Sequence, residues 1–222
     1  MHESLFARIE ARRDDLVALT RDLIRFPTVN PPGEAYTPCA EFLGERLKAR
    51  GFEVGYHRAE GEAGDSARYP RTNVVARREG TRPGPCVHFN GHIDVVAAGH
   101  GWTVPPFEGV VRDGRVYGRG ACDMKGGLVA AVAAVAAVRR AGVPLRGDLL
   151  LACVPGEEDG GLGTYATLRR GWRADACVVP EPTSLQLVPA NAGALTFRLT
   201  VQGRATHASR RTEGVSALEK LL

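Results

Sequence analysis

Apolar residues recur along this chain with two different spacings. Where they recur every three or four positions they predict helices, which we expect over residues 4–26, 37–51, 124–140 and 164–170. Short apolar runs between turn residues predict strands, which we expect over residues 52–57, 73–78, 86–90, 148–154 and 175–179. Because strands alternate with helices, the pattern predicts an α/β layered domain with a largely parallel sheet.

Local signals add detail to this pattern. Pro27 should end the first helix, and Thr37 should cap the second, with Pro38 in its first turn. Residues 110–117 have an Asp-Gly pair at their centre, which is typical of a two-residue β-hairpin turn.

The pattern changes near Pro189. Residues 194–202 alternate strictly between apolar and polar, which predicts a half-buried antiparallel strand, and a helix is expected to start at Gly214. One strand and about two helical turns cannot bury a core of their own. We therefore expect this last segment to open a second domain whose remainder is absent.

Composition excludes several classes of protein. Of 222 residues, 44% are hydrophobic, which excludes wholesale disorder. The longest apolar run, residues 126–138, is shorter than the ~20 residues of a membrane span, and no secretory signal is visible, so a cytoplasmic protein without a membrane partner is expected. The net charge of +4 is scattered, so no nucleic-acid partner is expected. Five cysteines without a Cys-x-x-Cys pair argue against a disulfide framework or a zinc ribbon.

Four acidic or histidine-bearing segments each follow a strand, a hairpin or an apolar run. They contain His92 and Asp94, Asp123, Glu157 and Glu158, and Glu181. Open α/β sheets bind their ligands beyond the carboxyl ends of the strands, which is where these side chains are expected.

Each segment alone has a structural alternative. His88 falls inside an apolar run and is interpreted as structural. Asp123 could be a helix N-cap, and the glycine-rich residues 118–127 around it could cradle a phosphate. The third glycine of a dinucleotide loop is missing, however, and the Asp123 charge would repel a phosphate.

Taken together, imidazole and carboxylate groups suit zinc, cobalt or manganese rather than calcium. A carboxylate that bridges two ions ~3.5–4 Å apart would build a two-metal site. Adjacent glutamates can divide the work, since one can bind a metal while the other acts as general base.

The four motifs resemble those of a known family. Gly91-His-Ile-Asp-Val-Val, Gly118-Arg-Gly-Ala-Cys-Asp-Met-Lys-Gly-Gly, Gly156-Glu-Glu-Asp-Gly-Gly and Glu181-Pro-Thr are similar to the motifs of co-catalytic zinc peptidases and amidohydrolases. The acetylornithine deacetylase / succinyl-diaminopimelate desuccinylase group is the most similar. The resemblance implies a three-layer catalytic domain with a largely parallel or mixed sheet. Its N-terminal portion would occupy residues 1–188, and residues 189–222 would begin an α+β lid.

The resemblance also implies roles for the ligands. His92 and Glu181 would hold one metal ion, Glu158 the other, and Asp123 would bridge the two. Both ions are expected to be Zn²⁺, with Co²⁺ or Mn²⁺ as alternatives. The family draws a further histidine for the second ion from beyond the lid, and no motif in this chain supplies it.

Three more residues receive roles from the resemblance. Glu157 would be the general base, and Asp94 would orient His92. His207, in the lid, would reach the active site of a partner subunit and steady the oxyanion there. A homodimer formed through a complete lid is therefore expected.

The implied function is metal-dependent hydrolysis of the amide bond in an N-acyl amino acid or a similar small amine. A dipeptidase or aminoacylase on the same scaffold is one alternative, and a truncated, non-catalytic binding domain is another. Because the second ion lacks a histidine, weak or single metal binding and little activity are expected of the chain as given.

Overall fold

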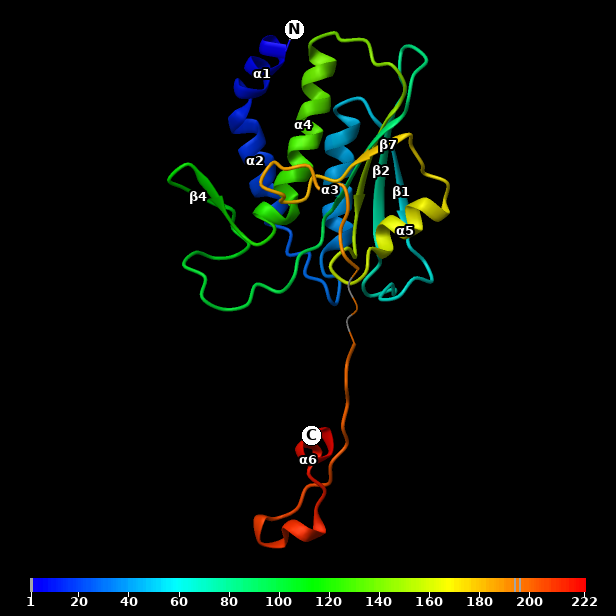
Figure 1. The fold of residues 1–222 in the computed structure, drawn as a ribbon. Coiled ribbons are helices and arrows are strands. Elements are labelled where there is room, and N and C mark those ends of the chain that lie inside the picture. Colours follow the sequence, from blue (N-terminus) through cyan, green and yellow to red (C-terminus); the bar gives the residue numbers. More distant parts are fainter. Residues whose placement is uncertain (1, 194, 196) are drawn as a thin grey trace. The chain divides into compact units, whose positions relative to one another are not determined.

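The computed structural model describes residues 2–193, 195 and 197–222. These residues divide into two compact units, of which the larger ends at Leu185 and the smaller comprises Gln186–Leu222 (Figure 1).

The larger unit is built on a five-stranded sheet. Its strands are β1 (Glu53–Arg58), β2 (Thr72–Arg78), β3 (Val87–His92), β6 (Leu149–Val154) and β7 (Ala176–Val178). Their order is β1-β2-β6-β3-β7, with β1, β2 and β6 antiparallel in turn and β6, β3 and β7 parallel. The predicted strands are confirmed to within two residues, and the sheet is mixed.

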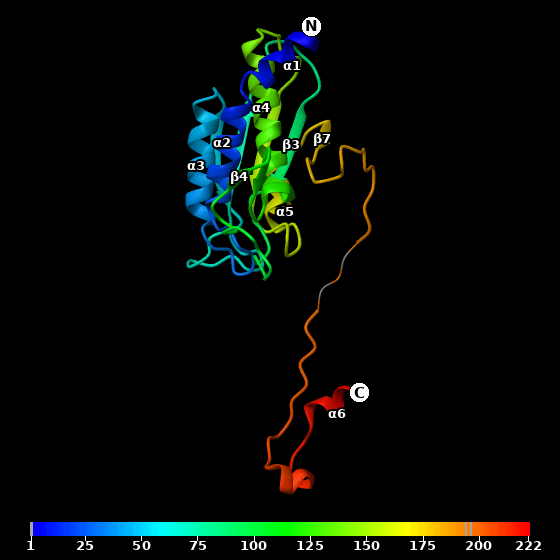
Figure 2. The ribbon, with the colours of Figure 1, turned by 90° about the vertical axis from the view of Figure 1, so that its left-hand side faces the viewer.

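Helices cover both faces of this sheet. The helices α2 (Arg13–Ile24), α3 (Tyr36–Lys48) and α4 (Gly126–Arg140) pack on one face, where Val74 and Ala76 of β2 join the main apolar core (Figure 2). Val75 points to the opposite face, where α5 (Leu162–Arg169) contacts β2 and β6 and Trp172 packs on a smaller cluster. The three-layer α/β architecture is therefore confirmed.

The helix predicted over residues 4–26 is two helices. α1 (His2–Glu10) is separated from α2 at Ala11 and Arg12, where the backbone of Arg12 leaves helical angles (φ −120°, ψ 18°). No large apolar side chain lies between Ile9 and Leu16. The chain can therefore change direction there without uncovering the core.

The predicted cap of the next helix is also wrong. α3 begins one residue earlier than Thr37, and its N-cap is Ala35 in a left-handed conformation (φ 52°). The amides of Gly33 and Glu34 both bond to the carbonyl of Val29, and this turn delivers the ring of Tyr36 into the interior.

The alanine-rich helix starts later than predicted. Residues 121–125 form a wide π-type turn, and regular helix begins at Gly126. The buried Lys125 side chain lies at this change, and its Nζ donates to the carbonyls of Leu23 and Phe26 at the end of α2 (3.0 and 2.9 Å). Residues 121–140 are long and apolar enough to cross a membrane by length and composition, but half of their most apolar stretch is buried in this fold, as in a core helix.

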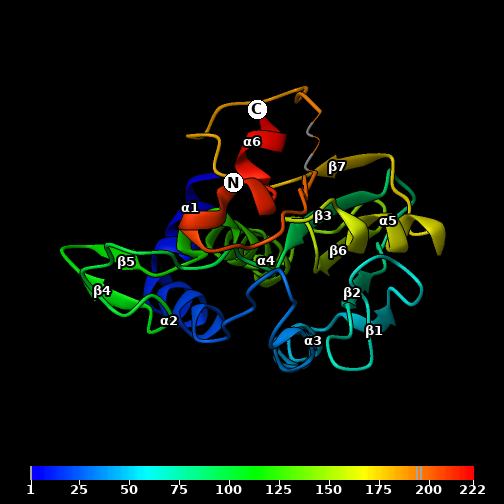
Figure 3. The same cartoon turned by 90° about the horizontal axis from the view of Figure 1, so that it is seen from below.

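The predicted hairpin is confirmed. β4 (Val110–Arg112) and β5 (Arg115–Tyr117) pair around Asp113 and Gly114, both at positive φ. The hairpin lies beside α2 and apart from the five-stranded sheet (Figure 3), and Arg21 Nε holds its base by donating to the carbonyl of Gly109 (2.7 Å).

The smaller unit contains a 3-10 helix, η2 (Ala208–Glu213), and α6 (Ala217–Leu221). The strand predicted over residues 194–202 is wrong for the described residues of that range, in which Leu195, Phe197 and Leu199 are exposed; residues 194 and 196 lie outside the described part. A half-buried strand needs a pairing partner. Within the described residues of this unit the only bridge joins Arg204 to Val215.

Leu151 tests the central packing, because it is buried (1% exposed) in the middle strand of the sheet. We expect Leu151→Ala to lower the free energy of unfolding by about 2–5 kcal/mol, through lost burial and a residual cavity. Urea unfolding followed by circular dichroism measures the effect. Leu187→Ala, at an exposed position, is the matched control and should change stability by less than about 0.5 kcal/mol. Equal effects of the two substitutions would contradict the assigned core.

Candidate metal centre

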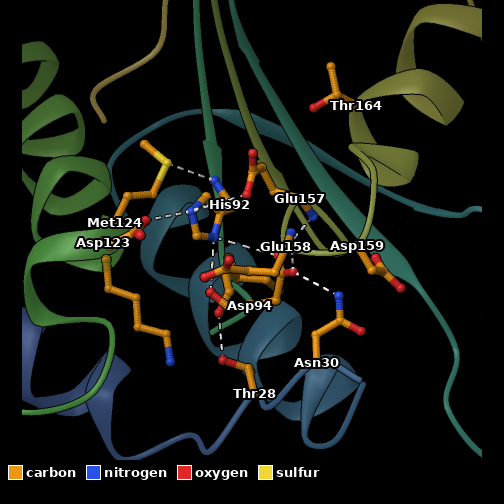
Figure 4. A network of polar contacts seen from close by, with 12 residues as sticks. Thr28, Asn30, His92, Asp94, Asp123, Met124, Glu157, Glu158, Asp159 and Thr164 are labelled. Atoms are coloured by element: carbon orange, nitrogen blue, oxygen red, sulfur yellow. Dashed lines mark hydrogen bonds and ion pairs between the residues drawn. The ribbon is translucent and has the colours of Figure 1, made fainter. Parts of the chain in front are cut away.

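The candidate site lies at one edge of the sheet, where parallel strands end together. His92 is the last residue of β3 and pairs with Val154, the last residue of β6. The loops with Asp94 and with Glu157 and Glu158 therefore leave the sheet side by side (Figure 4). Parallel strands end at the same edge, which explains why segments far apart in sequence meet here.

Two close approaches bring the remaining acids to this edge. The start of α4 packs tightly on the chain before Glu181: a Cβ built on Gly127 would lie 2.1 Å from the carbonyl oxygen of Pro180. Met124 Sδ accepts a hydrogen bond from the amide of His92 (3.2 Å), which holds the turn containing Asp123 against β3. A glycine at position 127 is thus a steric requirement of the site.

Asp94 is completely buried, and its carboxylate accepts three hydrogen bonds. The donors are Asn30 Nδ2 (3.1 Å) and the backbone amides of Glu157 (3.3 Å) and Glu158 (3.1 Å). The imidazole of His92 lies closer to the backbone of Asp94, since Nδ1 is 2.9 Å from the carbonyl oxygen and 3.6 Å from the carboxylate. Asp94 therefore contacts His92 mainly through its main chain, while its carboxylate accepts hydrogen bonds from the glutamate loop.

The outward nitrogen of His92 faces a group of acids. Nε2 lies 3.0 Å from Asp123 Oδ1, 3.6 Å from Glu181 Oε1 and 4.0 Å from Glu157 Oε2. His92, Asp123 and Glu181 each offer one ligand atom, and the three atoms lie within 4.8 Å of one another. With Nδ1–H donated to a carbonyl, Nε2 is the nitrogen available for a metal.

The electrostatics of this group also favour a cation. Burial raises the pKa of Glu181 to about 7; the negative charges of Asp123 and Glu157 add to this rise, while His92 opposes it. Burial also raises the pKa of Glu158, with a further contribution from Asp123. For His92 burial acts downward, but the surrounding carboxylates raise its pKa above the usual value. The site holds more negative charge than its own groups neutralise.

The other predicted residues are placed differently. Glu157 is half exposed beside His92, and Glu158 is partly buried and lies outside the group of three. His207 is exposed in the smaller unit, where its Nδ1 lies 2.8 Å from Ser209 Oγ.

The sequence analysis missed several residues that support this edge. Thr28 Oγ1 donates to the carbonyl of Ile93, Asn30 bonds to Asp94, and the buried Arg71 pairs with Asp159. Two prolines after Asn30 indicate a fixed loop, and they are the only local signal of this role.

The donor set fits a divalent metal ion. One imidazole nitrogen and two carboxylates form the kind of nitrogen and oxygen set that zinc, cobalt and manganese accept. The raised pKa of Glu181 also favours a bound cation, because a positive charge there would offset the repulsion among the carboxylates.

The fold of this chain is similar to those of solved dipeptidase and metallo-carboxypeptidase structures. Human carnosine dipeptidase 1 has a similar fold, with a TM-score of 0.69 and 22% identity over 81% of this chain and 41% of that one. The family model described as peptidase family M20/M25/M40 matches residues 88–221. The chain belongs to this family, and the resemblance drawn from its motifs is confirmed.

Named relatives agree with this assignment. An N-formyl-4-amino-5-aminomethyl-2-methylpyrimidine deformylase of Halalkalibacterium halodurans is 32% identical, with 99% of this chain and 53% of the relative covered. A succinyl-diaminopimelate desuccinylase of Gluconacetobacter diazotrophicus is 37% identical, with 93% and 54% covered. The chain thus spans about half the length of the curated relatives it matches.

Glu181 gives a pH-dependent prediction for the metal-free chain. Its pKa is raised from 4.5 in the unfolded chain to about 7 in the folded one, so its contribution to stability is complete below 4.5 and is lost as the pH rises through 7. Glu181→Gln cannot ionise, and the variant should gain stability over the parent chain as the pH rises from 4.5 to 8. Urea unfolding in the presence of a chelator measures this difference.

Glu60→Gln is the control, because Glu60 is exposed and is not one of the acids that face His92. Its stability difference from the parent chain should not change over this pH range. A Glu181→Gln difference that is equally flat would contradict the raised pKa.

Proposed function

We propose that this chain contains catalytic machinery of a metal-dependent amidohydrolase, which removes an acyl group from the nitrogen of an amino acid or a similar small amine. The main support is the convergence of His92, Asp123 and Glu181 with Glu157 beside them. The deformylase and desuccinylase relatives support the substrate class, because both names describe removal of an acyl group.

In this proposal the site holds two divalent ions, Zn²⁺ first and Co²⁺ or Mn²⁺ as alternatives. His92 and Glu181 would bind one ion, Glu158 would bind the other, and Asp123 would bridge them. When bound, such ions polarise an amide carbonyl and make water a better nucleophile at neutral pH. Among the described residues we assign only Asp123 and Glu158 to the second ion, so we expect this ion to bind more weakly than the first.

Glu157 is the proposed general base. It is half exposed and, among the acids near His92 Nε2, the farthest from that nitrogen, so its carboxylate is free to act on a water molecule. It takes a proton from the attacking water while the new C–O bond forms. It then gives this proton to the amine nitrogen as the C–N bond breaks, which leaves a carboxylic acid and a free amine.

The remaining residues complete the proposal at the level of the whole protein. Residues 1–188 belong to the catalytic domain and 189–222 begin a lid, a division supported by the separate small unit from Gln186 onward. His207 would steady the oxyanion in a partner subunit of a homodimer. A cytoplasmic location is supported by the cysteines, since all five are free thiols.

Substitution of Glu157 tests the reaction directly. Glu157→Gln should lower kcat for N-formyl and N-succinyl amino acid substrates by roughly 10²–10⁴-fold, because general base catalysis contributes about that factor. Zinc content by elemental analysis should match that of the parent chain, because Glu157 is not a proposed ligand. Hydrolysis is measured by release of the free amine.

Glu60→Gln is again the control and should keep parental activity. Near-parental turnover in Glu157→Gln would contradict the general-base role. A parent chain that binds zinc but hydrolyses none of these substrates, while cleaving dipeptides, would favour the dipeptidase alternative.

A further inference from the structure

A buried arginine contacts the loop of the two glutamates, although among the described residues its hydrogen bonds and ion pairs go to none of the proposed ligands. Arg71 immediately precedes β2 and is 1% exposed. Its guanidinium forms a two-pronged ion pair with Asp159, in which Nη1 lies 2.9 Å from Oδ1 and Nη2 bonds to Oδ2. Asp159 follows Glu158 directly, so the pair joins the antiparallel side of the sheet to the loop of the two glutamates.

Two glycines make room for this side chain. A Cβ built on Gly64 would lie 2.2 Å from Arg71 Nη2, and one built on Gly156 would lie 1.9 Å from Nη1. Gly156 also has a positive φ of 81°. The guanidinium therefore touches the loop at residue 156 and again at residue 159, on both sides of Glu157 and Glu158.

The backbone of Arg71 is held independently of its side chain. Its amide donates to Asp65 Oδ1 (2.8 Å), and Asp65 in turn pairs with Arg58. Because the main chain is anchored there, the planar guanidinium is presented to the loop in one orientation. A bidentate arginine–carboxylate pair fixes geometry as well as charge, which a lysine at the same place cannot reproduce.

The opposite side of the loop is held by Asp94. Its carboxylate accepts the amides of Glu157 and Glu158, and Asn30 Nδ2 also donates to it (Figure 4). The two glutamates therefore lie in a short segment tied at its amides by Asp94 and at its flanks by Arg71.

We propose that Arg71 is a positioning residue for Glu157 and Glu158, acting through Gly156 and Asp159. This inference rests on the proposed function for its catalytic meaning, because it assigns Arg71 the task of aiming the general base and the second-ion ligand. The structural part of the proposal does not depend on catalysis. Without the guanidinium of Arg71, residues 156–159 lose their fixed conformation while the sheet remains folded.

Amide hydrogen exchange of the metal-free chain tests this structural claim without metal or substrate. In Arg71→Met the amides of Glu157 and Glu158 should exchange at least about tenfold faster, because the loop opens locally. The amides of β6 should keep their parental rates. Arg77→Met is the matched control: Arg77 lies near the other end of β2, the strand that Arg71 precedes, and it also pairs with an aspartate, Asp148.

Cobalt binding provides the second readout. Outer partners of metal ligands typically change affinity or activity by 10–100-fold when they are removed. Titration of Arg71→Met with Co²⁺, followed by visible absorption, should show that order of loss for the ion held through Glu158 and little change for the ion held by His92. In turnover assays, kcat should fall with KM nearly unchanged.

Arg71→Lys keeps the charge but not the fork, and it is the variant to use if Arg71→Met does not fold. It should show the same local acceleration to a smaller degree. Unchanged exchange at Glu157 and Glu158 in the folded variant, or an equal change in Arg77→Met, would overturn the proposal. A parent chain that binds no divalent metal at His92, Asp123 and Glu181 would instead contradict the proposed function and leave the exchange result standing.

Discussion

One buried carboxylate connects the parts of this site. Asp94 has no exposed surface, and a charge so placed is tolerated only when hydrogen bonds compensate for the lost water. The compensation comes from Asn30, Glu157 and Glu158, which lie in two other segments of the chain. Its main-chain oxygen meanwhile lies against His92 Nδ1. The loops cannot separate without leaving this carboxylate unpaired in the interior.

The sheet brings the other residues of the site close to this carboxylate. Its parallel half, β6-β3-β7, has His92 at the end of β3 and continues into the segments that contain the two glutamates and Glu181, so these side chains meet at one edge. Its antiparallel half contributes Arg71, whose positive charge pairs with Asp159 rather than with the proposed ligands. Negative charge is thus left uncompensated in front of His92, where a cation can neutralise it. Behind the site the charges are already paired.

Much of this could be predicted from the sequence, for a physical reason. Apolar runs mark strands because both faces of the sheet are buried, and the motif residues stand out because each follows such a run. Local turn chemistry was equally informative in the hairpin, where Asp113 and Gly114 adopt the positive φ that their types favour.

The errors have a common origin in contacts between distant segments. Lys125, at the wide turn before α4, bonds to the end of α2, and the supporting roles of Asn30 and Arg71 depend on partners more than sixty positions away. The alternation of apolar and polar residues over 194–202 predicts which side chains a paired strand would bury. It does not show whether a partner strand is present. The spacing of residues along the chain does not predict either kind of contact.

The central claim is that His92, Asp123 and Glu181 together bind a metal ion. Crystals of the chain grown with zinc, measured on both sides of the zinc absorption edge, test it most directly. The account predicts an anomalous peak within bonding distance of His92 Nε2, about 2.0–2.1 Å, with oxygen ligands from Asp123 and Glu181. Zinc bound elsewhere, with His92 still bonded to Asp123 and no ion between them, would contradict it.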